Sequence, residues 1–103
     1  MKKSDLIHQI AYKMQSLPVE HIEESVNLIL NEISETLCKG GRVEVRGFGS
    51  FSLHYKASRN AHNPKTGEKV VTEPKYSAHF KPGKSLRERV NKSRENVTIE
   101  CEE

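Results

Sequence analysis

The stretch that most constrains the fold is residues 56–75, which carries turn-forming residues at its centre and a lysine at each end. Its only large aliphatic side chains are the adjacent Val70 and Val71. Burying two valines offsets far too little of the backbone entropy that is lost when the whole stretch becomes ordered. Either the rest of the chain holds this stretch in place, or it is a disordered basic loop.

The centre of this stretch favours a hairpin. Within Asn63–Gly67, Pro64 supplies the φ of about −65° that a type I or II turn needs, and Gly67 gives freedom at the exit. An extended two-stranded arm here would offer cations to DNA phosphates and end in a proline ring, an apolar wedge suited to a base step. The cations of the stretch are Lys56, Arg59, Lys65, Lys69 and Lys75.

Charge is segregated along the chain, so the net charge of +3 conceals a strong pattern. Residues 1–38 hold three Lys and six Asp or Glu, residues 39–94 hold fourteen Lys or Arg and four Glu, and residues 95–103 hold four Glu. A merely solvated surface usually intersperses its signs. The basic middle therefore favours a chain that turns one side toward phosphates.

The chain has enough residues for one domain but little material for a core. It has 103 residues, of which 34% are hydrophobic, with no Trp and a mean hydropathy of −0.73. Without the basic stretch and a polar tail, the remainder is marginal for a monomer. We therefore expect a second chain to complete the core.

The sequence contains few signals that indicate the cellular compartment of the protein. No apolar run approaches the roughly 18 residues that span a bilayer, and the N-terminus leads directly into a helical pattern. Cys38 and Cys101 lie far apart without metal-ligand spacing, which favours reduced thiols. We expect a cytoplasmic protein in which Cys38 is a small buried residue.

Apolar periodicity predicts an α+β chain. Helical spacing runs from Leu6 to Met14, and Pro18 is expected at the first position of a second helix whose apolar stripe continues to Leu37. Alternation with a period of two predicts strands, with Gly47–Gly49 as a turn. The expected elements are helices at 4–14, 18–38 and 83–91, and strands at 42–46, 50–55 and 76–82.

Some details of packing also follow from these patterns. The second strand buries either Phe51 and Leu53 or the opposite face, which contains His54. In the closing helix, Leu86 and Val90 are expected to face inward. The basic stretch therefore lies between the second and third strands of one sheet.

Three motifs carry a resemblance to a known family: Gly47-Phe-Gly-Ser-Phe51, Asn63-Pro-Lys-Thr-Gly67 after Arg59, and Phe80-Lys-Pro-Gly-Lys84. On these motifs the chain closely resembles the bacterial HU and integration host factor family of DNA-bending proteins over roughly residues 2–92. Within that family, residues 42–55 look most like the beta-type chains of integration host factor.

The resemblance implies an intertwined dimer in which helices of two chains form a base. A three-stranded antiparallel sheet would extend a long β-ribbon arm around DNA before a C-terminal helix, and bending would follow from proline intercalation in the minor groove. Pro64 would be the wedge. Arm contacts would come from Arg59, His62, Asn63, Lys65, Lys69 and Lys75, phosphate contacts from Lys3, Ser4, Lys56, Lys81, Gly83 and Lys84, and the dimer core from Phe48, Phe51 and Phe80.

The resemblance also bears on sequence preference. Arg46 would reach the minor groove and Glu44 would orient it, so that selectivity is largely a readout of DNA shape. From the residues alone, the two are a surface ion pair of little energetic weight. The chain departs from the family pattern at Ala61, where glycine is usual, and at His62, which replaces a permanent cation.

Other chemistry has little support. The five histidines lack Cys, Asp or Glu partners at recognised ligand spacing, and no phosphate-binding glycine loop or catalytic triad is present. We therefore expect no metal, no cofactor, no small-molecule substrate and no enzymatic activity.

The sequence thus predicts one DNA-binding domain at residues 1–94, with the arm at 56–75 and a flexible acidic tail at 95–103. The expected partners are double-stranded DNA and a homologous alpha-type chain, or a second copy of this chain. The family implies a place in the nucleoid and roles in recombination, transcription and translation regulation. The alternatives are a nonspecific HU-like homodimer and, from another class, an RNA or protein interaction module.

Overall fold

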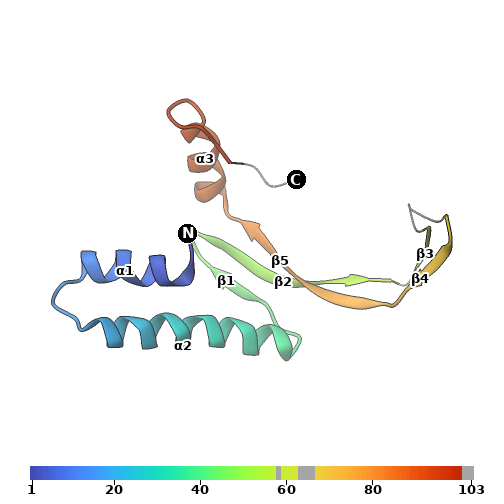
Figure 1. Cartoon of the computed structure of the whole chain (residues 1–103), viewed down its shortest axis with the longest axis horizontal. Helices are drawn as coiled ribbons and strands as arrows, with labels where there is room; N and C mark the ends of the chain where they lie inside the picture. Colours follow the sequence, from blue (N-terminus) through green and yellow to red (C-terminus); the bar gives the residue numbers. More distant parts are fainter. Residues whose placement is uncertain (58, 63–66, 101–103) are drawn as a thin grey trace.

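The computed structural model of the chain describes residues 1–57, 59–62 and 67–100, with the main chain alone at 59–62 and 70–72. Among these residues, two helices underlie a three-stranded sheet, a two-stranded arm reaches away from it, and a third helix follows (Figure 1). The predicted order of elements is confirmed. The elements are α1 (Lys3–Lys13), α2 (Val19–Cys38), β1 (Val43–Val45), β2 (Gly49–Lys56), β3 (Arg59–His62), β4 (Lys69–Thr72), β5 (Lys75–Pro82) and α3 (Lys84–Ser93).

Local hydrogen bonds define where α1 and α2 begin. The Lys2 N–H donates to the Asp5 carboxylate at 2.8 Å, which satisfies a donor at the start of α1. Pro18 lies one residue before α2 rather than at its first position, because its ψ of 145° is extended. Its carbonyl still accepts bonds from the N–H groups of His21 and Ile22, so Pro18 acts as the N-cap.

The buried core of the described residues lies between α1 and α2. Ile7, Ile22 and Val26 expose 6%, 4% and 7% of their surfaces, and Ile10 and Ala11 pack against them. These residues come from the apolar stripes of the two helices. The amphipathic pattern therefore predicted correctly which sides of the helices meet.

The second half of α2 is largely uncovered in the single chain. Ile29 and Leu30 expose 60% and 44% of their surfaces although they belong to the predicted apolar stripe. Cys38 is exposed, so the prediction that it is buried was wrong. It borders an open pocket of about 950 Å³ together with Leu37 and Leu53, between the end of α2 and the sheet.

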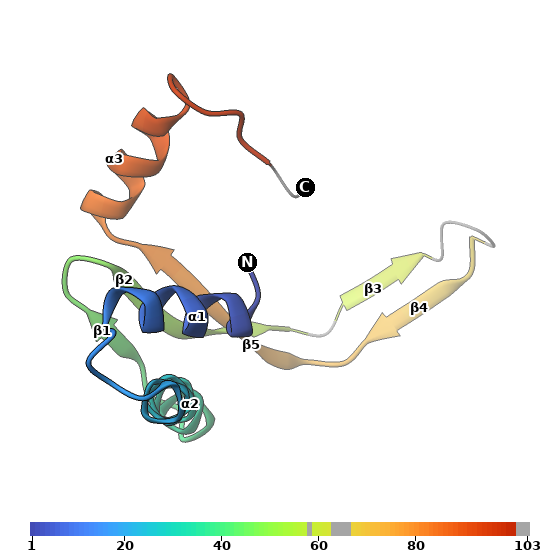
Figure 2. The same ribbon diagram turned by 60° about the vertical axis from the view of Figure 1, so that its left-hand side comes forward.

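β2 is the central strand of the sheet, which has the order β1-β2-β5 and antiparallel pairing. Pairing with β5 runs from Gly49 opposite Pro82 to Lys56 opposite Lys75. Beyond this point β3 and β4 pair antiparallel, and the arm that they form extends from the body in both views (Figure 2). The predicted two-stranded arm is confirmed over the described residues.

The turn between β1 and β2 consists of Arg46–Phe48, one residue earlier than predicted. Gly49 is already paired with Val45, and the Phe48 N–H donates to the Val45 carbonyl at 2.9 Å. Gly47 has a φ of +84°, which a residue with a side chain rarely adopts. The turn therefore depends on glycine at this position.

Alternation along the strands gives the sheet two unlike faces, because directly opposite residues share a face. On one face the rings of Phe51 and Phe80 lie 4.8 Å apart, and those of Tyr55 and Tyr76 lie 5.2 Å apart. Phe51 is half-buried whereas His54 is exposed, which settles the alternative left open by the sequence. We call this the aromatic face, made of Phe51, Leu53, Tyr55, Tyr76, Ala78 and Phe80. We call the other the polar face, made of Glu44, Ser50, Ser52, His54, Lys56, Lys75, Ser77, His79 and Lys81.

The single chain is extended rather than compact. Its radius of gyration is 19.0 Å, whereas a compact domain of this length would have about 13 Å. Its accessible surface is 9416 Å², against roughly 5900 Å² for a compact monomer of this mass.

The third helix, α3, stands apart from α1 and α2 in both views. Val90 is therefore 55% exposed, and the prediction that it faces inward was wrong. Leu86, which was also predicted to face inward, is half-buried.

Candidate nucleic-acid interface

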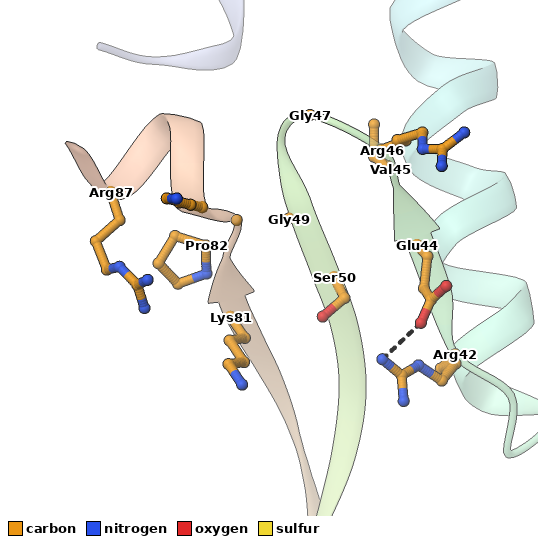
Figure 3. A pocket seen from close by; sticks show the side chains of 12 residues that line it. Arg42, Glu44, Val45, Arg46, Gly47, Gly49, Ser50, Lys81, Pro82 and Arg87 are labelled. Carbon is orange, nitrogen blue, oxygen red and sulfur yellow. Dashed lines mark ion pairs between the residues drawn. The ribbon is translucent and has the colours of Figure 1, made fainter. Parts of the chain in front are cut away.

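A shallow pocket opens where the polar face meets the start of α3. Its volume is about 710 Å³, and its wall combines the ends of β1 and β5, the turn after β1 and the first turn of α3 (Figure 3). The predicted site residues Glu44, Arg46, Lys81, Gly83 and Lys84 all lie here. Arginine and lysine side chains outnumber the carboxylate in this wall, so the pocket suits an anion. The other lining residues are Arg42, Val45, Gly47, Gly49, Ser50, Pro82 and Arg87.

A backbone hydrogen bond joins the two halves of the pocket. The Gly83 N–H donates to the Phe48 carbonyl at 2.8 Å and holds the end of β5 against the turn. A Cβ atom on Gly83 would lie 3.3 Å from that carbonyl, and one on Gly49 would lie 2.6 Å from the Lys81 carbonyl. Glycine at these two positions therefore allows the backbones to approach closely.

The N-terminus of α3 lies at the same pocket. The Arg87 N–H bonds to the Gly83 carbonyl at 3.0 Å, and the N–H groups before it have no acceptor within the helix. Together with the helix dipole, such groups attract anions. The exposed Lys84 and Arg87 side chains add positive charge to this end. The ion pair of Lys84 with Glu88, at 4.0 Å on the surface, offsets little of it.

Glu44 pairs with Arg42 in this structure. The Arg42 Nη2 atom lies 2.7 Å from the Glu44 Oε1 atom, and Arg46 points away from this pair (Figure 3). Alternation along the strand gives the carboxylate an arginine on either side, and it engages the first of them. The carboxylate that is predicted to orient Arg46 is thus held by Arg42 instead.

Arg42 and Arg87 are pocket residues that the sequence reasoning missed. Arg42 stands two residues before Glu44, so the period of the strand places both on one side. Arg87 lies one helical turn after Gly83 and is carried to the same wall of the pocket. Both signals were present in the sequence, but only for a reader who already knew which side of each element faces the pocket.

The polar face carries further cations toward the arm. Lys56 and Lys75 lie directly opposite each other in the last row of the sheet, and both are exposed. Like charges placed opposite each other on a sheet are unfavourable unless an anion lies between them. This row therefore fits the predicted role of Lys56 in phosphate binding and places Lys75, predicted as an arm contact, directly beside it.

Two histidines lie between this row and the pocket. The rings of His54 and His79 are stacked with their centroids 4.2 Å apart and an angle of 19° between their planes. Both side chains are exposed. They are diagonal neighbours across β2 and β5, because His54 pairs with Ser77 and His79 pairs with Ser52.

The predicted core aromatics form one cluster. The Phe80 ring lies 5.2 Å from the Phe48 ring and 4.8 Å from the Phe51 ring. Phe48 is 46% exposed, so the cluster is open on one side in the single chain. The predicted assignment of these residues to a dimer core stays a prediction.

Some of the predicted arm residues lie within the described part of the chain, and others lie outside it. Arg59 and His62 are the first and last residues of β3, and Lys69 pairs with His62 from β4. The predicted tip residues Asn63, Pro64 and Lys65 lie outside the described residues.

Lys3 and Ser4 lie at the start of α1 and away from the pocket wall. They are the first residues of this helix, where an anion is favoured. The Lys3 Nζ atom donates to the Asn27 Oδ1 atom of α2 at 2.9 Å. The structure therefore does not bring these two residues together with Lys81 and Lys84.

Among the described residues, no group of three or more His, Cys, Asp or Glu side chains is able to hold a metal ion. None of the helices in this part of the chain is long and apolar enough to cross a membrane.

The sequence profile of the family described as bacterial DNA-binding protein matches residues 1–91 of the chain. The chain belongs to this family. The match spans the helical base, the sheet, the arm and most of α3, so the pocket and the polar face both lie within it.

Individual relatives show which members of the family the chain resembles. Integration host factor subunit beta of Teredinibacter turnerae is 54% identical over 97 residues, which cover 94% of the chain and 99% of that protein. Integration host factor subunit beta of Escherichia coli is 52% identical over 91 residues, which cover 88% of the chain and 97% of that protein. These relatives confirm the predicted resemblance, and the chain is an architectural DNA-binding protein of the HU and integration host factor family and not an enzyme.

Solved structures agree with the fold. HU of Anabaena in a cocrystal structure with DNA matches with a TM-score of 0.79 at 32% identity, covering 87% of the chain and 97% of that protein. HU of Thermotoga maritima matches with a TM-score of 0.57 at 32% identity, covering 87% and 98%. The predicted α+β fold class is thereby confirmed.

Proposed function

We propose that this protein bends duplex DNA, with its arm in the minor groove and Pro64 inserted between base steps. The observation that carries the proposal is the positive charge at both ends of the polar face. One end is the pocket with Arg46 and Lys81, and the other is the row of Lys56 and Lys75, where the paired arm begins. Phosphates held along this surface would fix the duplex to the body while the arm reaches around it, and these contacts offset the cost of bending.

We infer that the functional unit is a dimer. Leu28, Ile29 and Leu30 expose 62%, 60% and 44% of their surfaces, and the pocket beside Cys38 is open. A second chain that covers this surface would remove apolar area from water at about 25 cal/mol per Å². The likeness to relatives named subunit beta supports a homologous alpha-type chain as the partner. Such a dimer would present two arms to one duplex.

Sequence preference is proposed to come from Arg46 in a narrow minor groove, by readout of DNA shape. The second candidate is an HU-like homodimer without such preference, which the likeness to HU structures favours. In either case the protein would act in the nucleoid. Roles in recombination, transcription and translation regulation are proposed for the first candidate.

Energy transfer between dyes on the ends of a duplex of roughly 35 base pairs tests the bending proposal. The full chain is added alone and then with an alpha-type chain, at one salt concentration, to a preferred A-tract site and to a shuffled duplex. Bending of the preferred site at concentrations that leave the shuffled duplex straight supports the first candidate. Equal bending of both by the chain alone supports the HU-like homodimer. Absence of bending at saturation would overturn the architectural mechanism.

Two variants assign the roles of residues in the same assay. Pro64→Ala is expected to reduce the bend, whereas Pro74→Ala, a matched proline change near the base of the arm, is expected to leave the bend unchanged. Arg46→Ala is expected to weaken the preferred site more than the shuffled one. Equal weakening of both duplexes would remove Arg46 from the selectivity mechanism.

A further inference from the structure

The chain reverses its direction directly after α3 and returns along the helix (Figure 2). The N–H groups of Asn96 and Val97 both donate to the Ser93 carbonyl, at 3.0 and 3.1 Å. These bonds close a tight turn at the end of the helix. The residues that follow the turn are therefore directed back toward the sheet and not away from it.

Ile99 lies on the returning segment, beside the apolar side of α3. It lines an open groove of about 590 Å³ together with Pro82, Leu86 and Val90. Leu86 lies about two helical turns before the end of α3, so Ile99 has come back over most of the length of the helix. Its side chain is 44% exposed, and more than half of its surface is thus covered. Ile99 therefore has the place of an anchor.

The groove adjoins the anion-binding pocket at the start of α3. Pro82 and Arg87 line both of them, so the same two side chains form part of each wall. Glu100 follows Ile99 directly and is exposed. Neighbouring Cα atoms are about 3.8 Å apart, whereas salt at physiological concentration screens charges over about 8 Å. The Glu100 carboxylate is therefore held beside the groove that shares Arg87 with the pocket.

The helix and the returning segment carry opposite charges. Residues 84–94 hold five Lys or Arg and one Glu, whereas residues 95–100 hold two Glu and no Lys or Arg. Attraction between them favours the folded-back course, most strongly at low salt. An apolar anchor and a charge match thus support the same position of the segment.

We propose that residues 95–100 form a strap that competes with DNA phosphates for the pocket at the start of α3. Ile99 is its anchor and Glu100 is its competing anion. The inference rests on the proposed function, because it requires a phosphate at this pocket. A carboxylate and a phosphate compete for the same cations, so DNA has to displace the strap before the pocket is fully available. If the strap covers the pocket for about two thirds of the time, the apparent affinity falls about threefold.

The strap is expected to limit how tightly DNA binds and not which sequence is chosen. Phosphates carry no sequence information, so a preferred and a shuffled duplex should be affected by the same factor. Because the competition is electrostatic, the factor should shrink as the salt concentration rises.

Fluorescence anisotropy of full-length variants, in the assembly that bends DNA, tests the inference. Ile99→Ser removes the anchor and keeps every charge, and it is expected to raise affinity for both duplexes about threefold at low salt. Glu100→Gln keeps the anchor and is expected to raise affinity about twofold. Val97→Ser is the matched control, because Val97 is 57% exposed, belongs to the same segment and lies outside the groove. Its affinity is expected to stay unchanged.

Several results would overturn the inference. Unchanged affinity for Ile99→Ser or for Glu100→Gln would do so, as would an equal gain from Val97→Ser or a gain confined to one duplex. A lower affinity for Ile99→Ser would also overturn it, because Ile99 would then support the binding assembly instead of opposing DNA. If neither the unmodified chain nor Ile99→Ser binds any duplex, the proposed function itself fails.

Discussion

The two faces of the β1-β2-β5 sheet are made by alternate residues of the same strands, yet they differ in what they contribute. On the aromatic face, the rings of Phe51 and Phe80 pack 4.8 Å apart, and Phe48 joins them from the turn. On the polar face, the ion pair of Arg42 and Glu44 has side chains that are 61% and 69% exposed, and such pairs stabilise a fold little. The aromatic face therefore supports folding, and the polar face is available for binding.

A shift of strand register by one residue would exchange these faces, because side chains alternate with a period of two. The register is maintained in part by the close approach at Gly49 and by the bond between Gly83 and Phe48. Variants that change one face and leave the other intact can separate the contribution of the aromatic face to folding from that of the polar face to binding.

The largest effect is expected for Phe80→Ala. Phe80 contacts two rings and is half-buried, so its truncation should lower the free energy of unfolding by about 3 kcal/mol. Urea denaturation measures the change. Ser77→Ala, on the polar face of the same strand, should change it by less than about 0.5 kcal/mol. Equal losses from both variants would contradict the division between the faces.

Gly49→Ala should have the next largest effect. Its new Cβ would lie 2.6 Å from the Lys81 carbonyl and from the Phe80 ring, so β2 and β5 must separate, at a cost of about 2 kcal/mol. Gly47→Ala is the control, because its Cβ meets open space and only the φ of +84° is strained, by about 1 kcal/mol. Thermal unfolding of the two variants compares these costs. A larger loss for Gly47→Ala would show that the turn, not the close approach, maintains the register.

A smaller effect, on binding and not on folding, is expected for Lys81→Ala. Loss of one phosphate contact should weaken every duplex by roughly threefold to tenfold and reduce the slope of log affinity against log salt by about one. Stability should change by less than about 0.5 kcal/mol. Fluorescence anisotropy over a range of salt concentrations gives the slope, with Lys13→Ala on α1 as the matched lysine control. An unchanged slope for Lys81→Ala would exclude it from phosphate binding.

Glu44→Gln should have the smallest effect. Removing the carboxylate makes the pocket more positive, so affinity for a shuffled duplex should rise about twofold while stability stays within about 0.5 kcal/mol. The measurement is again anisotropy, at low salt. A lower affinity for the shuffled duplex would show that the carboxylate acts by positioning an arginine rather than through its charge.

Much of the fold could be predicted because its signals are local. Helical spacing predicted the apolar stripes on which Ile7 and Val26 lie, and alternation predicted the strands. The turn residues in the basic stretch favoured the hairpin that β3 and β4 form. Errors of one residue at Pro18 and at the turn of Gly47 arose because the end of an element depends on backbone angles that residue preferences do not determine.

The site was less predictable because its residues come from distant segments. The period of the strand places Arg42 on the side of Glu44, but only the fold shows that the two form an ion pair and that Arg87 reaches the pocket. Likewise, the apolar character of Val90 indicated burial, but α3 stands apart and leaves it exposed. Burial depends on which elements are neighbours, and that is a property of the whole arrangement.

By itself, the sequence determined the two faces of the sheet, the basic arm and the concentration of cations between residues 39 and 94. These properties follow from residue order, because strand alternation and charge do not depend on long-range contacts. Only the tertiary structure decided the row of Lys56 and Lys75, the stacking of His54 on His79 and the assembly of the shallow pocket at the start of α3. Each of these requires a particular register between strands, and that register results from packing of the whole sheet.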